Sequence, residues 1–96
     1  MFEWDARKAA GNRIKHGVSF EEAATVFGDP DALDGPDVRH SEKESRFLRL
    51  GRAATGRVLI VAYTARRQDD GERIRIISAR RASRKERAAY AAPSRD

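Results

Sequence analysis

Cysteine is absent from the 96-residue sequence, which excludes disulfide bonds and thiolate metal sites. Long apolar runs are absent too: the longest, VLIVAY at Val58–Tyr63, is far shorter than the roughly 20 residues that span a bilayer. The first residues, MFEWDARKAA, lack the apolar stretch of a secretion signal. We therefore expect a soluble, cytoplasmic protein that forms a single domain over residues 1–96, with its core at about residues 2–91.

Ligands for a metal ion are scarce. The sequence has two histidines, and its carboxylates match no ligand spacing. The segment DPDALDGPDVRH starts like a calcium loop, but Leu33 stands at its fifth position and His40 at its twelfth. No glycine-rich phosphate loop and no serine nucleophile elbow is present. The sequence therefore predicts neither a metal site nor a cofactor.

Charge is abundant but unevenly placed. Residues 19–45 hold eight acidic and two basic residues, whereas residues 46–96 hold fourteen basic and five acidic ones, and the net charge is +5. Sixteen of the 20 basic residues are arginine, whose planar guanidinium binds phosphate through two parallel hydrogen bonds. Two explanations stay open: a surface that binds phosphates, or a genome whose base composition favours Arg and Ala codons.

The first third of the sequence predicts a short strand and two helices. The alternation in FEW, residues 2–4, is typical of a strand. Asp5 then caps a helix that runs to about His16, with Ile14 on its apolar side. The capping box SFEE, residues 19–22, starts the second helix.

The rest of the sequence predicts a sheet and a last helix. Residues 28–44 are acidic and rich in turn-forming residues, and we expect a loop with at most one short edge strand there. Short turns separate three predicted strands, at residues 45–52, 57–64 and 72–79, which favours an antiparallel meander. Arginines alternate with Leu or Ile in the outer two strands, so we expect one apolar face and one basic face carrying Arg49, Arg73 and Arg75. The predicted fold is α+β: a small antiparallel sheet of three to four strands, two N-terminal helices and one C-terminal helix.

The segment IRIISARRASRKERAAY changes from strand to helix and concentrates arginines at the change. The strand is expected to end near Ala79, and a capping box at residues 83–86 starts the helix. Arg80 and Arg81 would then lie beside a helix N-terminus, which itself favours anions, so the pair predicts a phosphate site. For Arg84 and its neighbours on the helix, a solvated surface is the simpler interpretation.

These groups suffice for one reaction that needs no cofactor, the cleavage of RNA by attack of its 2′-hydroxyl on the adjacent phosphate. Histidine moves protons near neutral pH, and arginine stabilises the charge that builds on the phosphate. His16 and His40 are the candidates for proton transfer, although His16, together with Lys15, also suits the C-terminal end of a helix dipole, and His40 also suits a plain loop surface. We name His16, His40, Arg80 and Arg81 as catalytic candidates and Lys15, Arg49, Arg73, Arg75 and Arg84 as RNA-binding candidates.

Four segments in this order, FEWDARKAAGNRIKHGVSFEEA, RHSEKESRFLRLG, VAYT and RIRIISARRASRKERAAY, resemble the BrnT toxin family. The resemblance covers about residues 2–90 and implies a ribonuclease of a type II toxin–antitoxin system with a RelE-like fold. The positions that match the family pattern are Trp4, Asp5, Lys8, Asn12, Lys15, His16, Gly17, Val18, Phe20, Glu22, His40, Ser41, Glu44, Arg46, Tyr63, Ile77, Ser78, Ala79, Arg80, Arg81, Ala82, Arg84, Glu86 and Tyr90.

The resemblance also implies a partner: an antitoxin of the BrnA type with a ribbon-helix-helix DNA-binding half, in a complex of two toxins and two antitoxins that contacts DNA through the antitoxin. Two other readings of the residues stay open. The basic face suits a non-catalytic nucleic-acid-binding module, or the charged surfaces serve only to bind another protein.

Overall fold

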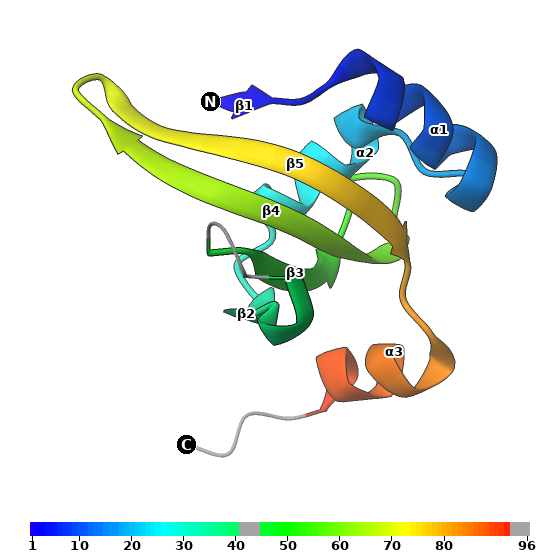
Figure 1. Cartoon of the computed structure of the whole chain (residues 1–96). Helices are drawn as coiled ribbons and strands as arrows, with labels where there is room; N and C mark the ends of the chain where they lie inside the picture. The colour runs from blue at the N-terminus through cyan, green and yellow to red at the C-terminus, as the bar shows by residue number, and fades with distance from the viewer. Residues whose placement is uncertain (41–44, 93–96) are drawn as a thin grey trace.

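The computed structural model describes residues 1–40 and 45–92, in which a five-stranded sheet is combined with three α-helices and two short 3-10 helices (Figure 1). In chain order the elements are β1 (Phe2–Glu3), α1 (Ala6–His16), α2 (Phe20–Thr25), the 3-10 helix η1 (Val26–Gly28), β2 (Leu33–Pro36), the 3-10 helix η2 (Val38–His40), β3 (Phe47–Arg52), β4 (Val58–Gln68), β5 (Gly71–Arg81) and α3 (Arg84–Ala91). The predicted α+β class, the two N-terminal helices and the C-terminal helix are confirmed.

The sheet has the strand order β1-β5-β4-β3-β2, and it is mixed. The meander β3 to β5 and the short edge strand β2 in the acidic segment are confirmed as antiparallel neighbours. The expectation of three to four antiparallel strands was wrong, because β1 adds a fifth strand that runs parallel to β5, with Phe2 opposite Ile74. β1 is two residues long, so its pairing depends on the tertiary fold that returns the N-terminus to the sheet edge, and local sequence does not encode it.

The helix ends follow their local signals closely, with one exception. Asp5 caps α1, and the capping box of α3 is complete, with Ser83 and Glu86 each accepting from the other's backbone N–H. The box of α2 is half-formed: Ser19 accepts from the Glu22 backbone N–H, but the Glu22 carboxylate turns to Arg57, 2.5 Å away. An ion pair with Arg57, in the turn between β3 and β4, therefore replaces the second half of the predicted box.

The hydrophobic core lies between the sheet and the helices α1 and α2, and α3 lies on the other side of the sheet (Figure 1). Its largest fully buried side chains are Phe20, Leu59, Ile76, Val18, Val26 and Val61. The expected place of Ile14 in the apolar side of α1 was wrong, since Ile14 is 88% exposed. Asn12 instead faces inward: its side-chain amide donates to Val18 O and Ala79 O, at 2.9 and 2.8 Å, and accepts from Ala79 N. These bonds fix the C-terminal end of α1 against the end of β5.

The expected division into an apolar and a basic sheet face was wrong for β3. Arg49 pairs with Val61, a core residue of β4, and paired residues lie on the same face of a sheet. Arg49 is therefore on the helix-covered face, where its side chain is 17% exposed and donates to Val26 O, Asp29 O and Asp34. Leu48 takes the opposite face. The alternation in the sequence correctly indicated that β3 has two different faces. Its pairing with the buried residues of β4 determines which face turns toward the core.

Candidate functional site

A groove of about 530 Å³ lies on the sheet face opposite the core. Its floor is apolar and its rim is charged. Its lining residues are Leu48, Ile60, Ala62, Ile77, Ser78 and Ala79 from the strands, and His16, Asp37, Arg39, His40, Arg46 and Arg80 around them. The groove thus joins the end of α1, the 3-10 helix η2 and three strands, and it brings together three of the four catalytic candidates, His16, His40 and Arg80.

His40 is oriented by a buried carboxylate. Its Nδ1 lies 3.3 and 3.2 Å from the two carboxylate oxygens of Asp37, a residue that is 7% exposed, whereas the His40 side chain is 62% exposed. The Asp37 backbone N–H donates to Arg46 O at 2.8 Å, which ties η2 to the start of β3. A histidine whose Nδ1–H donates to a carboxylate keeps Nε2 as the acceptor, which is the form a general base needs.

Arg80 is held by Glu86 across the joint between β5 and α3. The two groups form a bidentate pair, with Nη1 to Oε1 at 2.7 Å and Nη2 to Oε2 at 2.9 Å. The hydrogen bonds from Arg80 are the main reason that the pKa of Glu86 is lowered to about 2, and they also raise the pKa of Arg80. Both groups are therefore charged at neutral pH. The pair fixes the guanidinium, which has five N–H donors, at the edge of the groove.

Arg81 does not share this groove. β5 continues through Arg81, so the expected strand end near Ala79 was wrong, and successive residues of the strand still alternate between faces. Arg81 pairs with the core residue Leu59, whereas Arg80 pairs with Ile60 of the groove. The two arginines that the sequence places side by side therefore serve two different pockets.

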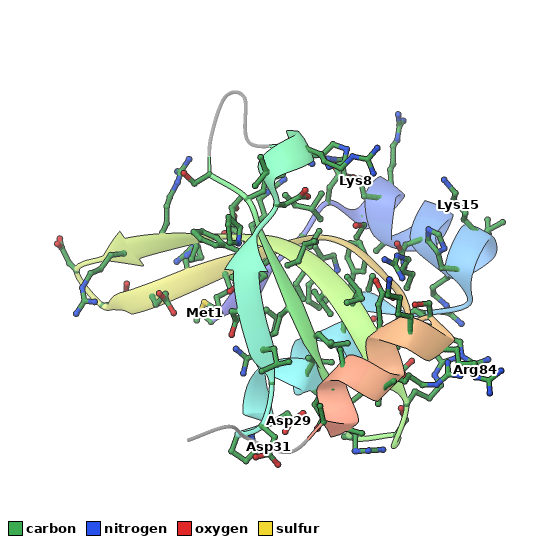
Figure 2. All side chains as sticks on the ribbon, turned by 90° about the horizontal axis from the view of Figure 1, so that it is seen from below. Met1, Lys8, Lys15, Asp29, Asp31 and Arg84 are labelled. Carbon is green, nitrogen blue, oxygen red and sulfur yellow. The ribbon has the colours of Figure 1, made fainter. Side chains whose placement is uncertain are left out.

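The RNA-binding candidates lie outside the groove lining. Arg49 is held in the protein by the contacts given above. Arg73 and Arg75 both pair with Glu3 of β1, at 3.3 and 3.0 Å. Figure 2 shows Lys15 on α1 and Arg84 on α3 extending into solvent. These placements give Arg49, Arg73 and Arg75 contacts within the fold and leave Lys15 and Arg84 accessible to a partner.

Sequence reasoning missed several of the charged residues of the site. Asp37 and Arg39 were not singled out, Arg46 was noted only as a family match, and Glu86 was predicted as a helix cap and not as the partner of Arg80. The spacing of Asp37 and His40, three residues apart in one helical turn, is a signal that could have found that pair. The family-pattern positions Ser41 and Glu44 lie outside the described residues.

Metal-binding clusters and membrane-spanning helices are both absent from the described part of the chain. Within residues 1–40 and 45–92, no group of three or more His, Cys, Asp or Glu side chains is placed to hold a metal ion. In the same part of the chain, no helix has the length and apolar character needed to cross a membrane.

Comparison with known proteins identifies the family. The sequence matches the model of a family described as "Ribonuclease toxin, BrnT, of type II toxin-antitoxin system" over residues 4–86. The class of protein is thus a ribonuclease toxin that has an antitoxin partner. Within that class, the chain belongs to the BrnT family.

One solved structure adds support for the fold. The chain is similar to the 1.1 Å crystal structure of the ribonuclease toxin BrnT of Brucella abortus, with a TM-score of 0.62 and 24% sequence identity, over 88% of this chain and 99% of that one. At this level of identity the similarity shows a shared fold. A search of curated proteins gave no match.

Proposed function

We propose that this protein is a metal-independent endoribonuclease that cleaves cellular RNA by attack of a 2′-hydroxyl on the adjacent phosphate. The observation that carries the proposal is the meeting of His16, His40 and Arg80 around one groove. Two imidazoles and a fixed guanidinium provide a base, an acid and a cation, which are the three groups that this reaction needs. Membership of a ribonuclease toxin family supports the same reaction class.

The geometry suggests a role for each group. His40, oriented by Asp37, is placed to accept the proton of the 2′-hydroxyl, and His16 is the candidate that protonates the leaving 5′-oxygen. Arg80 would bind the phosphoryl oxygens as their charge grows. Arg39 and Arg46 add positive charge on the rim, and the apolar floor gives a base or ribose a surface to pack on.

The pair of Arg80 with Glu86 is compatible with phosphate binding. Glu86 accepts from two of the five N–H donors of the guanidinium and the Arg81 carbonyl from a third, at 3.3 Å, so Arg80 can hold Glu86 and still donate to a phosphate. Glu86 then acts as a positioning residue, since it fixes the plane of the guanidinium before RNA arrives.

RNA cleavage in the presence of EDTA tests the proposal. We expect purified protein to cut labelled RNA into products with 2′,3′-cyclic phosphate ends, at a rate that EDTA leaves unchanged within about twofold, because the chemistry uses only side chains. Loss of activity with EDTA and its return with Mg²⁺ would contradict the mechanism. Retention of RNA without any cleavage would favour the non-catalytic nucleic-acid-binding module instead.

We further propose that the antitoxin is of the BrnA type, with a ribbon-helix-helix half, and that two toxins and two antitoxins form the complex, which contacts DNA through the antitoxin. The basis is the family, whose type II systems pair a toxin with a protein antitoxin. Ribbon-helix-helix proteins bind DNA as dimers, which gives the expected stoichiometry. An enzyme that acts on cellular RNA would work in the cytoplasm.

Co-expression with the protein encoded by the neighbouring reading frame tests this partner. Growth arrest caused by the toxin alone should be relieved, and light scattering after size exclusion should give a mass equal to two copies of each chain. A mass that corresponds to any other ratio would overturn the proposed assembly, and a neighbour that neither binds nor protects would overturn the partner.

A further inference from the structure

A second pocket, of about 490 Å³, lies at the end of the sheet where the β3–β4 turn meets α3. Its lining includes four arginines and no acidic residue. The lining residues are Arg52, Gly56, Arg57, Val58, Arg81, Arg87, Tyr90 and Ala91. Such a concentration of positive charge around one pocket would attract an anion.

The protein neutralises only one of these arginines with a salt bridge. Arg57 pairs with Glu22, with Nε to Oε2 at 2.8 Å. Arg52 and Arg87 donate to backbone carbonyls, Gly56 O at 2.9 Å and Ala82 O at 2.8 Å. The Arg81 side chain is exposed and makes no hydrogen bond or salt bridge within the described residues, although, after the hydrogen bond from Arg57, its charge is one of the causes that lower the pKa of Glu22.

The carboxylates of Glu22 and Asp29 contact lining residues from outside the pocket, but they are fewer than the four arginines. Asp29 accepts from the Arg52 backbone N–H at 2.7 Å and from the Tyr90 hydroxyl at 2.6 Å, so it fixes the position of both residues. The Arg52 guanidinium in turn lies 5.6 Å from the centre of the Tyr90 ring. Arg52 and Tyr90 are thus held in place, and the described residues give Arg52, Arg81 and Arg87 no salt bridge.

We propose that this pocket binds a backbone phosphate of the RNA substrate away from the scissile bond. The inference rests on the proposed function, because it gives the same RNA a second anchor. Guanidinium groups fit phosphate oxygens through paired, charge-assisted hydrogen bonds. Four arginines line the pocket without an acidic residue, so it suits an anionic group better than the apolar face of a partner helix.

The position of the pocket connects it with the groove. Arg80 and Arg81 are adjacent in β5, so their Cα atoms are about 3.8 Å apart, while one lines the groove and the other lines the pocket. An RNA strand with its scissile phosphate at Arg80 can therefore continue around the end of β5 to Arg81. Binding of this kind follows the backbone and carries no base preference.

Arg81→Ala tests the pocket, with Arg67→Ala as the matched control. Arg67 is an exposed residue of the β4–β5 hairpin, its side chain makes no hydrogen bond or ion pair within the described residues, and its replacement changes the net charge equally. We would measure Kd by fluorescence anisotropy with 2′-O-methyl RNA, which cannot undergo 2′-hydroxyl attack, between 50 and 200 mM salt. Arg81→Ala should weaken binding about tenfold and reduce the slope of log K against log salt by about 0.7, the value for one phosphate of a single strand. Arg67→Ala should change neither quantity.

Cleavage kinetics separate this inference from the proposed function. On cleavable RNA, Arg81→Ala should raise KM about tenfold and change kcat by less than about threefold, because a distant phosphate contact binds substrate and transition state equally. An unchanged Kd and salt slope overturn the pocket while RNA cleavage by the wild type stands. A changed slope in a protein that never cleaves RNA supports the pocket and overturns the enzyme. If Arg81→Ala weakens only the complex with the antitoxin, the pocket belongs to that partner and the RNA inference fails.

Discussion

Replacement of Arg80 by alanine should lower the rate of RNA cleavage by about 10²-fold or more, with little change in KM. The reason is that removal of one preorganised charge contact to a developing oxyanion typically costs about 10² to 10³ in kcat. Single-turnover cleavage of a labelled RNA, with enzyme in excess, would measure the effect. Arg67→Ala is again the control for a loss of charge that lies outside the groove.

Because Arg80→Ala also leaves Glu86 without its ion-pair partner, a second variant is needed. Arg80→Ala leaves the Glu86 carboxylate unpaired near the groove, where it would repel phosphate. In Arg80→Ala/Glu86→Gln both charges are gone, and if repulsion by Glu86 were the cause of the loss, this double variant would recover the rate. We expect no recovery. A loss below about threefold in Arg80→Ala, with an unchanged circular dichroism spectrum, would leave Arg80 with the structural role of holding α3.

How much of this structure can be predicted from the sequence depends on how far apart in the chain the interacting residues lie. The caps at Asp5 and Ser83 are local hydrogen bonds over three residues, and both were predictable. The face taken by Arg49 was not, because it depends on the register between β3 and β4. The pairing of β1 with β5 was missed for the same reason, since it joins residues about seventy positions apart.

The candidate site, too, was only partly predictable from the sequence. Residue type and the strand-to-helix change pointed to the histidines and to Arg80, and the structure places these three around one groove. Their partners were not evident, because Asp37 lies in a segment expected to be loop and Glu86 had already been assigned as a cap. Arg80 and Arg81 appeared to act together only as long as the strand was expected to end before them.

Replacement of His40 by alanine should have an equally large effect, about 10²- to 10⁴-fold in kcat, which is the range that a general base contributes. The effect should depend on pH in a way that a structural role does not reproduce. In the wild type, kcat should rise with pH as the base loses its proton and fall where the acid loses its own. His40→Ala should remove the rise and His16→Ala the fall, while Arg80→Ala should keep both at a lower rate.

Two further measurements connect the loss in His40→Ala with the position of the ring. Added imidazole should restore part of the activity of His40→Ala, since a small base can enter the groove of about 530 Å³, and it should not restore Arg80→Ala. Asp37→Asn removes the carboxylate that lies 3.2 Å from Nδ1 of His40 and should lower kcat about tenfold with KM unchanged. If His40→Ala keeps the rise of kcat with pH and imidazole has no effect, proton transfer does not pass through His40. The groove would then be a surface that binds RNA without cutting it, as in the non-catalytic alternative.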